Sequence, residues 1–334
     1  MKLIFKLVLI IIVVMLALPS CSGAIDRVMN HTYDKGGFVF LVVGFDDAAE
    51  NTDVLFTVNY NKNENSIKIA QIPRDTYFNF GSSQNKINQF YATMRVKGYD
   101  KKEALKRTSD AISSAFGTEF DGFLGITTNT FKKIVESIGG VDIELSSDMT
   151  IAIDGEPTLS LKSGSNHING NEATVFVRYR SGYAGQDLGR IDAQKIFLEA
   201  LFRKITSGIS LPSIFSLVAG IQSDAVTDVQ IIDIVKIVLG GFNKERELTK
   251  YFVTVPGEAI QSAGGLSYYV LQKYSAEKIA RKYMYANKEF DPEGRFCNSS
   301  EVAFENVYRD SSENYKEYSD EDIKDIRISL TNNK

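Results

Sequence analysis

Residues 36–72 read GGFVFLVVGFDDAAENTDVLFTVNYNKNENSIKIAQI, and three strands can be placed in them. The unbroken apolar run at 36–44 is typical of a buried strand. The segment 53–60 alternates apolar and polar residues, and after a polar turn at 61–65 the segment 66–72 returns, which predicts a β-hairpin. Strand-like and helix-like segments then alternate along the chain. The sequence therefore predicts an α/β (α+β) fold with one mixed central β-sheet flanked by helices.

Further helices and strands are placed by capping residues and by apolar periodicity. Asp100 is the expected N-cap of a helix that reaches Phe116. The segment 191–205 has the pattern of an amphipathic helix with an apolar face of Leu198, Leu201, Phe202 and Ile205. The remaining predicted elements are helices at 129–138, 210–220, 227–240 and 275–286 and strands at 123–127, 141–145, 173–179, 250–255 and 267–271, with short strands within 148–163.

The composition excludes several classes of function. The 334 residues carry a net charge of −4 with many charges of both signs, which indicates a soluble surface and no nucleic acid partner. Two cysteines without a C-x-x-C pair exclude a zinc ribbon and thioredoxin-like chemistry. The H-E-x-x-H, G-x-S-x-G, P-loop and G-x-G-x-x-G motifs are absent, so any phosphate must be bound without a glycine-rich loop.

Residues 1–23 have the pattern of a signal peptide or membrane anchor. Lys2 and Lys6 form a positively charged region before an apolar run from Leu7 to Leu18, which is short for a transmembrane helix and fits a secretory segment. Leu18-Pro19-Ser20-Cys21 resembles a bacterial lipoprotein box, so Cys21 is a candidate for lipidation. An uncleaved signal-anchor helix is the alternative. In both cases we expect the protein on the extracytoplasmic face of the cell membrane.

Two further parts of the chain are expected. The predicted sheet and helices occupy residues 36–286, and no internal repeat is found there. Residues 287–334 are polar and charged and lack apolar periodicity, so we expect a poorly ordered tail.

Acidic residues lie at the ends of the first predicted strands. Asp46 comes just after the first strand, and Asp53 opens the second. Such oxygen ligands suit Mg²⁺, which binds one or two carboxylates together with substrate phosphates and water. On these residues alone, solvated turn aspartates are the more common interpretation.

A basic and acidic pair follows the third strand. Arg74 and Asp75 come directly after Pro73, and Lys86 follows in a polar loop. By itself such a pair is more often a surface ion pair. The pair becomes a stronger candidate for a functional site because it lies at a strand end next to Asp46 and Asp53.

The sharpest cluster of charged residues comes later in the chain. Arg178 and Arg180 are two apart in a predicted strand, so both would project from one face. Asp187, Arg190 and Gln194 would form one stripe of the following helix. Arginine binds phosphate oxygens bidentately and stays charged at any working pH. The pattern fits an ion-pair network and an anion site about equally well.

Together these segments resemble the LytR-CpsA-Psr family of cell-envelope proteins, whose motifs occur here in order over about residues 36–286. The matching segments are Gly44-Phe45-Asp46, Thr52-Asp53, Ile72 to Tyr77, Lys86-Ile87-Asn88, Gly139 to Asp142, Val177 to Arg180, Asp187 to Gln194 and Gly265 to Tyr269. Asn51 and Ala193 stand where the family usually has arginine, which leaves this site poorer in positive charge.

The resemblance implies a Mg²⁺-dependent phosphotransferase. Such an enzyme moves a glycopolymer, of the teichoic acid or capsular polysaccharide type, from polyprenyl pyrophosphate to peptidoglycan. Phosphoryl transfer depends mainly on positioning and charge stabilisation, which arginines and Mg²⁺ supply. The resemblance implies that Asp46 and Asp53 hold the metal. The implied pyrophosphate ligands are Arg74, Lys86, Arg178, Arg180, Arg190 and Gln194, and the implied catalytic residues are Arg74, Asp75, Asp187 and Arg190.

Alternatives remain open for the same residues. A polyprenyl-pyrophosphate hydrolase would use the same site with water as the acceptor. A non-catalytic protein would only bind or sense the lipid-linked substrate, and Asn51 and Ala193 favour that case. The helices expected at 190–206, 210–220 and 227–240 are apolar enough to line a polyprenyl cavity or to form ordinary core.

Overall fold

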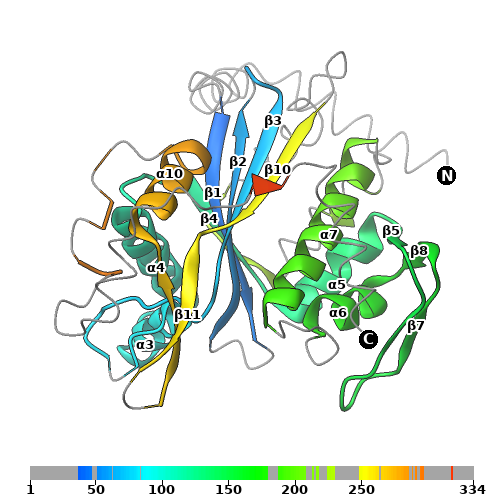
Figure 1. Ribbon diagram of the computed structural model, residues 1–334, viewed down its shortest axis with the longest axis horizontal. Coiled ribbons are helices and arrows are strands. Elements are labelled where there is room, and N and C mark those ends of the chain that lie inside the picture. The colour runs from blue at the N-terminus through cyan, green and yellow to red at the C-terminus, as the bar shows by residue number, and fades with distance from the viewer. Residues whose placement is uncertain are drawn as a thin grey trace, which may run out of the picture.

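The computed structural model has a seven-stranded β-sheet at its centre (Figure 1). The strand order is β13-β10-β3-β2-β1-β4-β9; β3 and β10 are parallel, β1 and β4 are parallel, and the other neighbours are antiparallel. The predicted fold class is therefore confirmed. The structure describes residues 37–46, 51–61, 63–82, 84–179, 187–207, 213, 216–217, 224–229, 248–262, 265–285, 288, 290–291, 294–296 and 317–318.

The three strands predicted at the start of the chain are confirmed. β1 (Gly37–Phe45), β2 (Thr52–Asn61) and β3 (Ser66–Ile72) pair antiparallel in that order at the centre of the sheet. The remaining strands of the sheet are β4 (Gly122–Ile126), β9 (Val226–Thr227), β10 (Thr249–Thr254) and β13 (Glu317–Tyr318).

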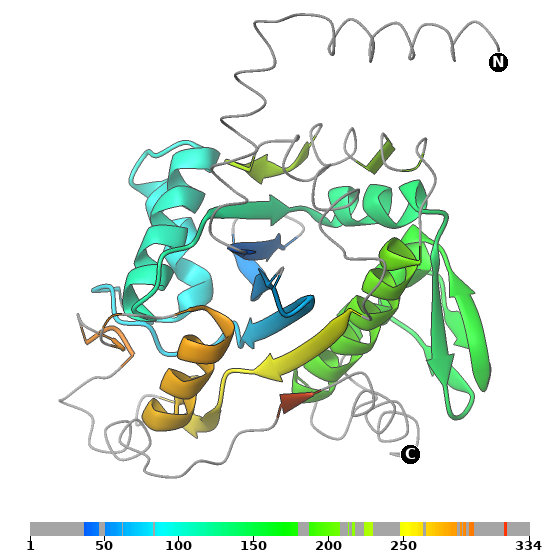
Figure 2. The ribbon, with the colours of Figure 1, turned by 90° about the horizontal axis from the view of Figure 1, so that it is seen from above.

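Helices cover both faces of the sheet, as seen from above in Figure 2. On one face lie α3 (Phe90–Val96), α4 (Lys101–Ala115) and α10 (Lys273–Tyr283). On the other face lie α5 (Thr128–Ser137), α6 (Gly170–Arg178) and α7 (Asp187–Thr206). Each set buries its own apolar cluster against the strands, so two cores enclose the sheet.

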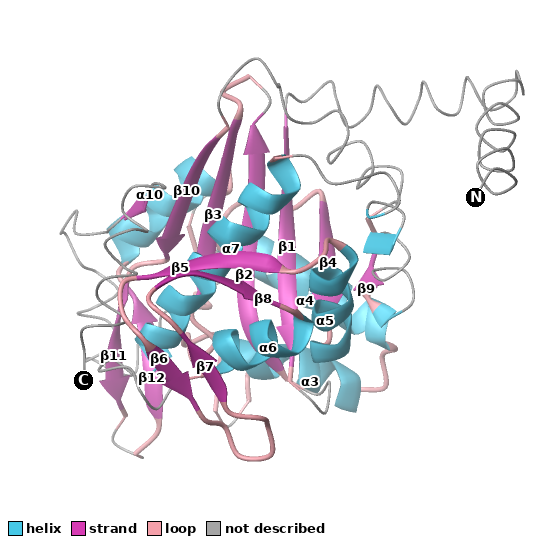
Figure 3. Cartoon of the chain, turned by 90° about the vertical axis from the view of Figure 1, so that its right-hand side faces the viewer, coloured by secondary structure: helices cyan, strands magenta, loops and turns pink. Residues whose placement is uncertain are grey.

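Smaller elements complete the described part of the chain. A short 3-10 helix, η1 (Ile87–Gln89), precedes α3. Figure 3 views the molecule from the side that carries β5 to β8. The small two-stranded pairs are β5 (Val141–Leu145) with β8 (Gly164–Ile168), β6 (Met149–Ile151) with β7 (Leu159–Leu161), and β11 (Gly257–Gln261) with β12 (Ser267–Leu271).

The predicted strand at 173–179 is wrong, because residues 173–178 belong to helix α6 and Tyr179 is its C-cap. The Asn169 side chain accepts hydrogen bonds from the backbone N–H groups of Asn171 and Glu172, and the Glu172 side chain accepts one from the Asn169 N–H. This capping box starts a helix in spite of the β-branched and aromatic residues that follow. Arg178 therefore lies in the last turn of a helix and not on a strand.

Helix α7 contains the predicted helix, but its fully buried residues differ from those expected. Ile191, Ile196 and Phe197 are buried, whereas Leu198, Leu201, Phe202 and Ile205 are only partly buried. The reason is that α7 is packed between other elements, with α6, β5 and β10 all against it. Most of the helices predicted at 210–220 and 227–240 lies outside the described residues.

The packed core includes residues beyond 286. Phe290 and Phe296 are buried in the cluster under α3, α4 and α10, and the rings of Phe116 and Phe296 are 4.8 Å apart. The Arg295 Nη1 donates to the Asn79 carbonyl at 3.2 Å. Part of the segment expected as a tail is therefore held against the domain.

The expected membrane segment lies outside the described residues, which begin at residue 37. Among the helices that the structure describes, none has the length and apolar character needed to cross a membrane. Lipidation at Cys21 thus stays a prediction.

Candidate functional site

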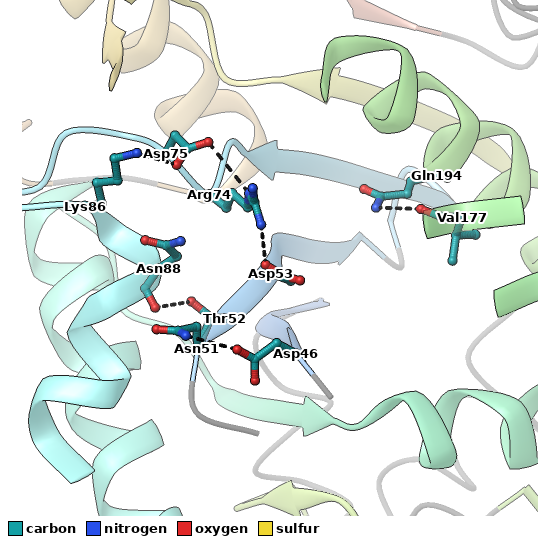
Figure 4. A network of polar contacts seen from close by, with 10 residues as sticks. All are labelled: Asp46, Asn51, Thr52, Asp53, Arg74, Asp75, Lys86, Asn88, Val177 and Gln194. Carbon is teal, nitrogen blue, oxygen red and sulfur yellow. Dashed lines mark hydrogen bonds and ion pairs between the residues drawn. The ribbon is translucent and has the colours of Figure 1, made fainter. Parts of the chain in front are cut away.

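The chain brings three strand ends together at one end of the sheet (Figure 4). β1 ends at Phe45, which pairs with Thr52 at the start of β2, and β3 runs antiparallel to β2 and ends at Ile72. The residues beside these ends are Asp46, Asp53 and Arg74, which are at most 28 positions apart in the sequence. The Arg74–Asp53 ion pair described below joins the second and third of these strand ends, and Asp46 lies beside the first.

Asn51 and Asp46 close the end of the β1–β2 pair. The Asp46 N–H donates to the Asn51 carbonyl at 3.0 Å, and the Asn51 Nδ2 donates to the Asp46 Oδ2 at 3.0 Å. Asn51 therefore fixes the orientation of this carboxylate and adds no positive charge. An arginine at this position would add one.

The turn that carries Arg74 is fixed by hydrogen bonds on both sides. The Thr76 N–H and Oγ1 both donate to the Pro73 carbonyl, at 3.0 and 2.6 Å. Tyr269 of β12 donates its N–H to the Asp75 carbonyl at 2.9 Å and accepts from the Tyr77 N–H at 2.9 Å. Side chains on so well-tied a turn are pre-organised, which favours binding of a ligand in one geometry.

Tyr269 is itself held in place through its hydroxyl. The hydroxyl donates to the Val255 carbonyl at 3.0 Å, and burial raises the pKa of Tyr269 well above its usual range. The phenol therefore remains a neutral donor at any working pH. The motif at 265–269 implies no role for this residue, whereas the bridge between Thr76 and Tyr269 gives it one.

A row of alternating charges crosses the turn. The Lys86 Nζ lies 2.9 Å from Asp75 Oδ1, Arg74 Nε lies 3.7 Å from Asp75 Oδ2, and Arg74 Nη1 lies 2.5 Å from Asp53 Oδ1. All four side chains are partly exposed, between 17% and 34%. They are ordered by each other and still open to a ligand.

The segment with Lys86 is attached to the same turn by its backbone. Asn88 donates its N–H to the Arg74 carbonyl at 3.3 Å, and its own carbonyl accepts from Thr52 Oγ1 at 3.2 Å. The Ile87 N–H donates to the Thr76 carbonyl at 2.9 Å. This explains why Lys86 reaches the site although it lies on neither neighbouring strand.

Gln194 and Arg190 approach from α7. Both are buried, at 7% and 5% exposure, and lie one helical turn apart on the same stripe, as predicted. The Gln194 Oε1 accepts from Gln71 Nε2 at 2.6 Å, and Gln71 lies in β3 three residues before Arg74. This hydrogen bond connects α7 to the strand that leads into the site.

The remaining predicted residues are Arg178, Arg180 and Asp187. Arg178 forms an ion pair with Glu156, on the loop between β6 and β7, at 3.3 Å. Arg180 and the side chain of Asp187 lie outside the described residues. The expectation that Arg178 and Arg180 share one face of a strand is wrong, because Arg178 ends a helix.

Asp46 and Asp53 place two carboxylates beside neighbouring strand ends. Among the described residues, no group of three or more His, Cys, Asp or Glu side chains could hold an ion. Two carboxylates on neighbouring strand ends nevertheless match the ligands that Mg²⁺ takes when a phosphate supplies the remaining oxygens. Asn51 Nδ2 donates to one oxygen of Asp46, and Arg74 Nη1 donates to one oxygen of Asp53.

The central strands leave apolar side chains partly exposed on the α7 side of the sheet. On β1 and β2, Leu41, Val43 and Leu55 are fully buried on the α4 side. Phe40, Val42, Phe56 and Val58 on the opposite face are only partly buried. The middle of a sheet covered on both faces should bury both sets. We call Phe40, Val42, Phe56 and Val58 the apolar strip.

The chain matches the LytR_cpsA_psr family over residues 21–284. A polyisoprenyl-teichoic acid–peptidoglycan teichoic acid transferase, TagU of Bacillus mycoides, is 26% identical over 250 residues, which cover 72% of this chain and 76% of that protein.

Two solved structures share the fold. The crystal structure of Bacillus subtilis TagV has a TM-score of 0.60 at 22% identity and covers 76% of this chain and 99% of its own. Protein gbs0355 of Streptococcus agalactiae has a TM-score of 0.67 at 18% identity and covers 85% of this chain and 99% of its own. At these identities the likeness shows the fold alone.

Proposed function

The chain belongs to the LytR_cpsA_psr family, and from this premise we propose that it is an enzyme that transfers a glycopolymer from polyprenyl pyrophosphate to peptidoglycan. Relatives at 26% and 22% identity are named as polyisoprenyl-teichoic acid–peptidoglycan teichoic acid transferases, which supports a teichoic acid type of polymer. A capsular polysaccharide is the second candidate for the polymer.

One structural observation carries the proposal: a charged cluster lies at the end of the same two strands that carry the apolar strip. Asp46 follows β1 and Asp53 opens β2, and Phe40 and Phe56 lie further along these strands on the α7 side. A polyprenyl pyrophosphate has one strongly charged end and one long apolar chain. Its two ends match these two neighbouring surfaces.

The residues of the turn have distinct roles in the proposed reaction. Arg74 and Lys86 bind the pyrophosphate oxygens, and their positive charge stabilises the charge that develops on the transferred phosphoryl group. Asp75 lies between these two cations and holds both in place. Mg²⁺ held by Asp46 and Asp53 would supply further neutralisation of that charge. Arg190 is a further candidate ligand from α7.

The decisive experiment is a transfer assay with the full chain in detergent. The protein is incubated with a polyprenyl-pyrophosphate glycan, Mg²⁺ and peptidoglycan oligomers, and the products are separated by mass. We expect peptidoglycan-linked glycan that depends on Mg²⁺. Release of phosphate without linked glycan would identify a hydrolase, and binding without any product would identify a non-catalytic protein; either result refutes transfer.

We also propose that Cys21 is lipidated and tethers the protein outside the cell membrane. The substrate's polyprenyl chain lies in the membrane, so a tether keeps the site within reach of it. Cells fed radiolabelled palmitate should label the wild type and not Cys21→Ala, with Cys297→Ala as the matched control that keeps the label. Equal label on wild type and Cys21→Ala, or none on either, contradicts lipidation at this residue.

A further inference from the structure

Two glutamine side chains, Gln71 of β3 and Gln194 of α7, form a chain of hydrogen bonds beside the site. The Gln71 Nε2 donates to Gln194 Oε1 at 2.6 Å, and the Gln194 Nε2 donates to the backbone carbonyl of Val177 at 3.2 Å. Gln71 is 5% exposed and Gln194 7%. These two hydrogen bonds join β3, α7 and the last turn of α6 at the point where β3 leads into the Arg74 turn.

The orientation of both amides follows from chemistry. The Val177 carbonyl can only accept a hydrogen bond, so the group that faces it must be the NH₂ of Gln194. The oxygen of Gln194 then faces Gln71, which must offer its own NH₂. Flipping either amide would set two acceptors or two donors against each other. Gln71 therefore determines which way the Gln194 amide points.

This arrangement leaves one amide oxygen without a donor among the described residues. Among the residues that the structure describes, the buried Gln71 Oε1 has no hydrogen-bond donor. A buried acceptor without a donor lowers stability, so a pair kept for stability alone would be better replaced by apolar side chains of the same shape. The pair is therefore better explained by what it does for the neighbouring site.

We propose that Gln71 is a positioning residue that holds Gln194 ready for the pyrophosphate. With Oε1 bound to Gln71 and one Nε2 hydrogen bound to Val177, Gln194 keeps a single hydrogen on Nε2 for the ligand. Gln71 sets its direction. Gln71 lies in β3, so it also links the Gln194 amide to the Arg74 turn. Gln194 and Arg74 therefore keep a fixed separation. The inference rests on the proposed function.

The test is a double-mutant cycle in the full chain with Gln71→Met, Gln194→Met and the double variant. Methionine preserves length and removes the hydrogen bonds. Each single variant should raise KM for the lipid-linked substrate about five- to tenfold, as expected for loss of one such bond, with kcat nearly unchanged. The double variant should show about the same rise, because the pair acts as one unit.

Thermal unfolding separates positioning from a structural role. Gln71→Met should leave Tm unchanged or raise it, because it removes the buried unpaired oxygen. The matched control is Gln272→Met, whose Nε2 donates to Glu258 Oε1 at 3.3 Å on the surface outside the site; it should leave KM unchanged. Multiplying effects in the double variant, an unchanged KM in Gln71→Met, or a lower Tm alongside the higher KM would overturn the inference.

A binding measurement keeps this inference distinct from the proposed function. If the wild type makes no linked product, the proposed transfer activity is refuted, and the positioning role of Gln71 is tested by binding alone. The same variants are then titrated with farnesyl pyrophosphate, and the dissociation constant takes the place of KM. A five- to tenfold weaker binding in Gln71→Met, not multiplied in the double variant, supports positioning, and unchanged binding refutes it.

Discussion

Arg74→Ala is expected to lower kcat/KM for glycopolymer transfer by roughly two to three orders of magnitude, the usual effect of removing a group that stabilises transition-state charge. Arg74 is the one cation that contacts both Asp53 and Asp75 in the described part of the site. Its loss would remove the proposed phosphate ligand and would also leave the two carboxylates facing the incoming pyrophosphate. Arg74→Lys should recover only part of the activity, because lysine cannot bind two oxygens through a planar fork.

The measurement is the initial rate of transfer over a range of lipid-linked substrate concentrations. Arg107→Ala is the matched control, because Arg107 forms an ion pair with Glu103 at 2.8 Å on the exposed side of α4. That variant should stay within about twofold of the wild type, as is usual for surface substitutions. An Arg74→Ala variant that keeps more than a tenth of wild-type kcat/KM would exclude Arg74 from the site.

Asp53→Asn is expected to reduce transfer roughly 100-fold and to raise the Mg²⁺ concentration needed for half-maximal activity. The amide is nearly the same size as the carboxylate but has no charge for the cation. Asp53 also orients Arg74, at 2.5 Å, so the fall in activity alone does not assign the metal. A shift in the Mg²⁺ concentration needed for half-maximal activity would assign the metal to Asp53.

A second measurement isolates metal binding from catalysis. Mg²⁺ together with inorganic pyrophosphate should raise the Tm of the wild type, because a ligand that binds only the folded state stabilises it. The same addition should leave the Tm of Asp53→Asn nearly unchanged. Asp110→Asn, which replaces the surface partner of Lys106 at 2.7 Å, should respond like the wild type. An equal rise in Asp53→Asn and wild type would remove Asp53 from the metal site.

Local sequence patterns predicted the elements whose signals lie within a few residues. The Asp100 cap is an example: its side chain accepts from the Glu103 N–H at 2.8 Å, and α4 starts where expected. The same kind of signal was present for α6, since Asn169 and Glu172 have the spacing of a capping box. It was outweighed by the β-branched and aromatic residues at 174–179, which pack here on a helix.

The candidate site was predicted only in part, because local sequence patterns place some of its residues and not others. Residues that flank strand ends could be placed from the strand order alone, and Asp53 and Arg74 do meet. Arg178 could not be placed, because its position depends on whether α6 is a helix or a strand. Its pairing with Glu156 joins two segments that share no sequence pattern.

The sequence by itself determined the mixed sheet, the strand ends that carry Asp46, Asp53 and Arg74, and the family resemblance, because each follows from short spacings and motifs. The tertiary structure alone decided which distant residues meet. Gln71 contacts Gln194 across 123 positions, and Tyr269 ties the turn that presents Arg74. It also decided that the apolar strip on β1 and β2 stays partly exposed. Burial depends on which elements cover a strand, and the alternation of residues along that strand does not encode this.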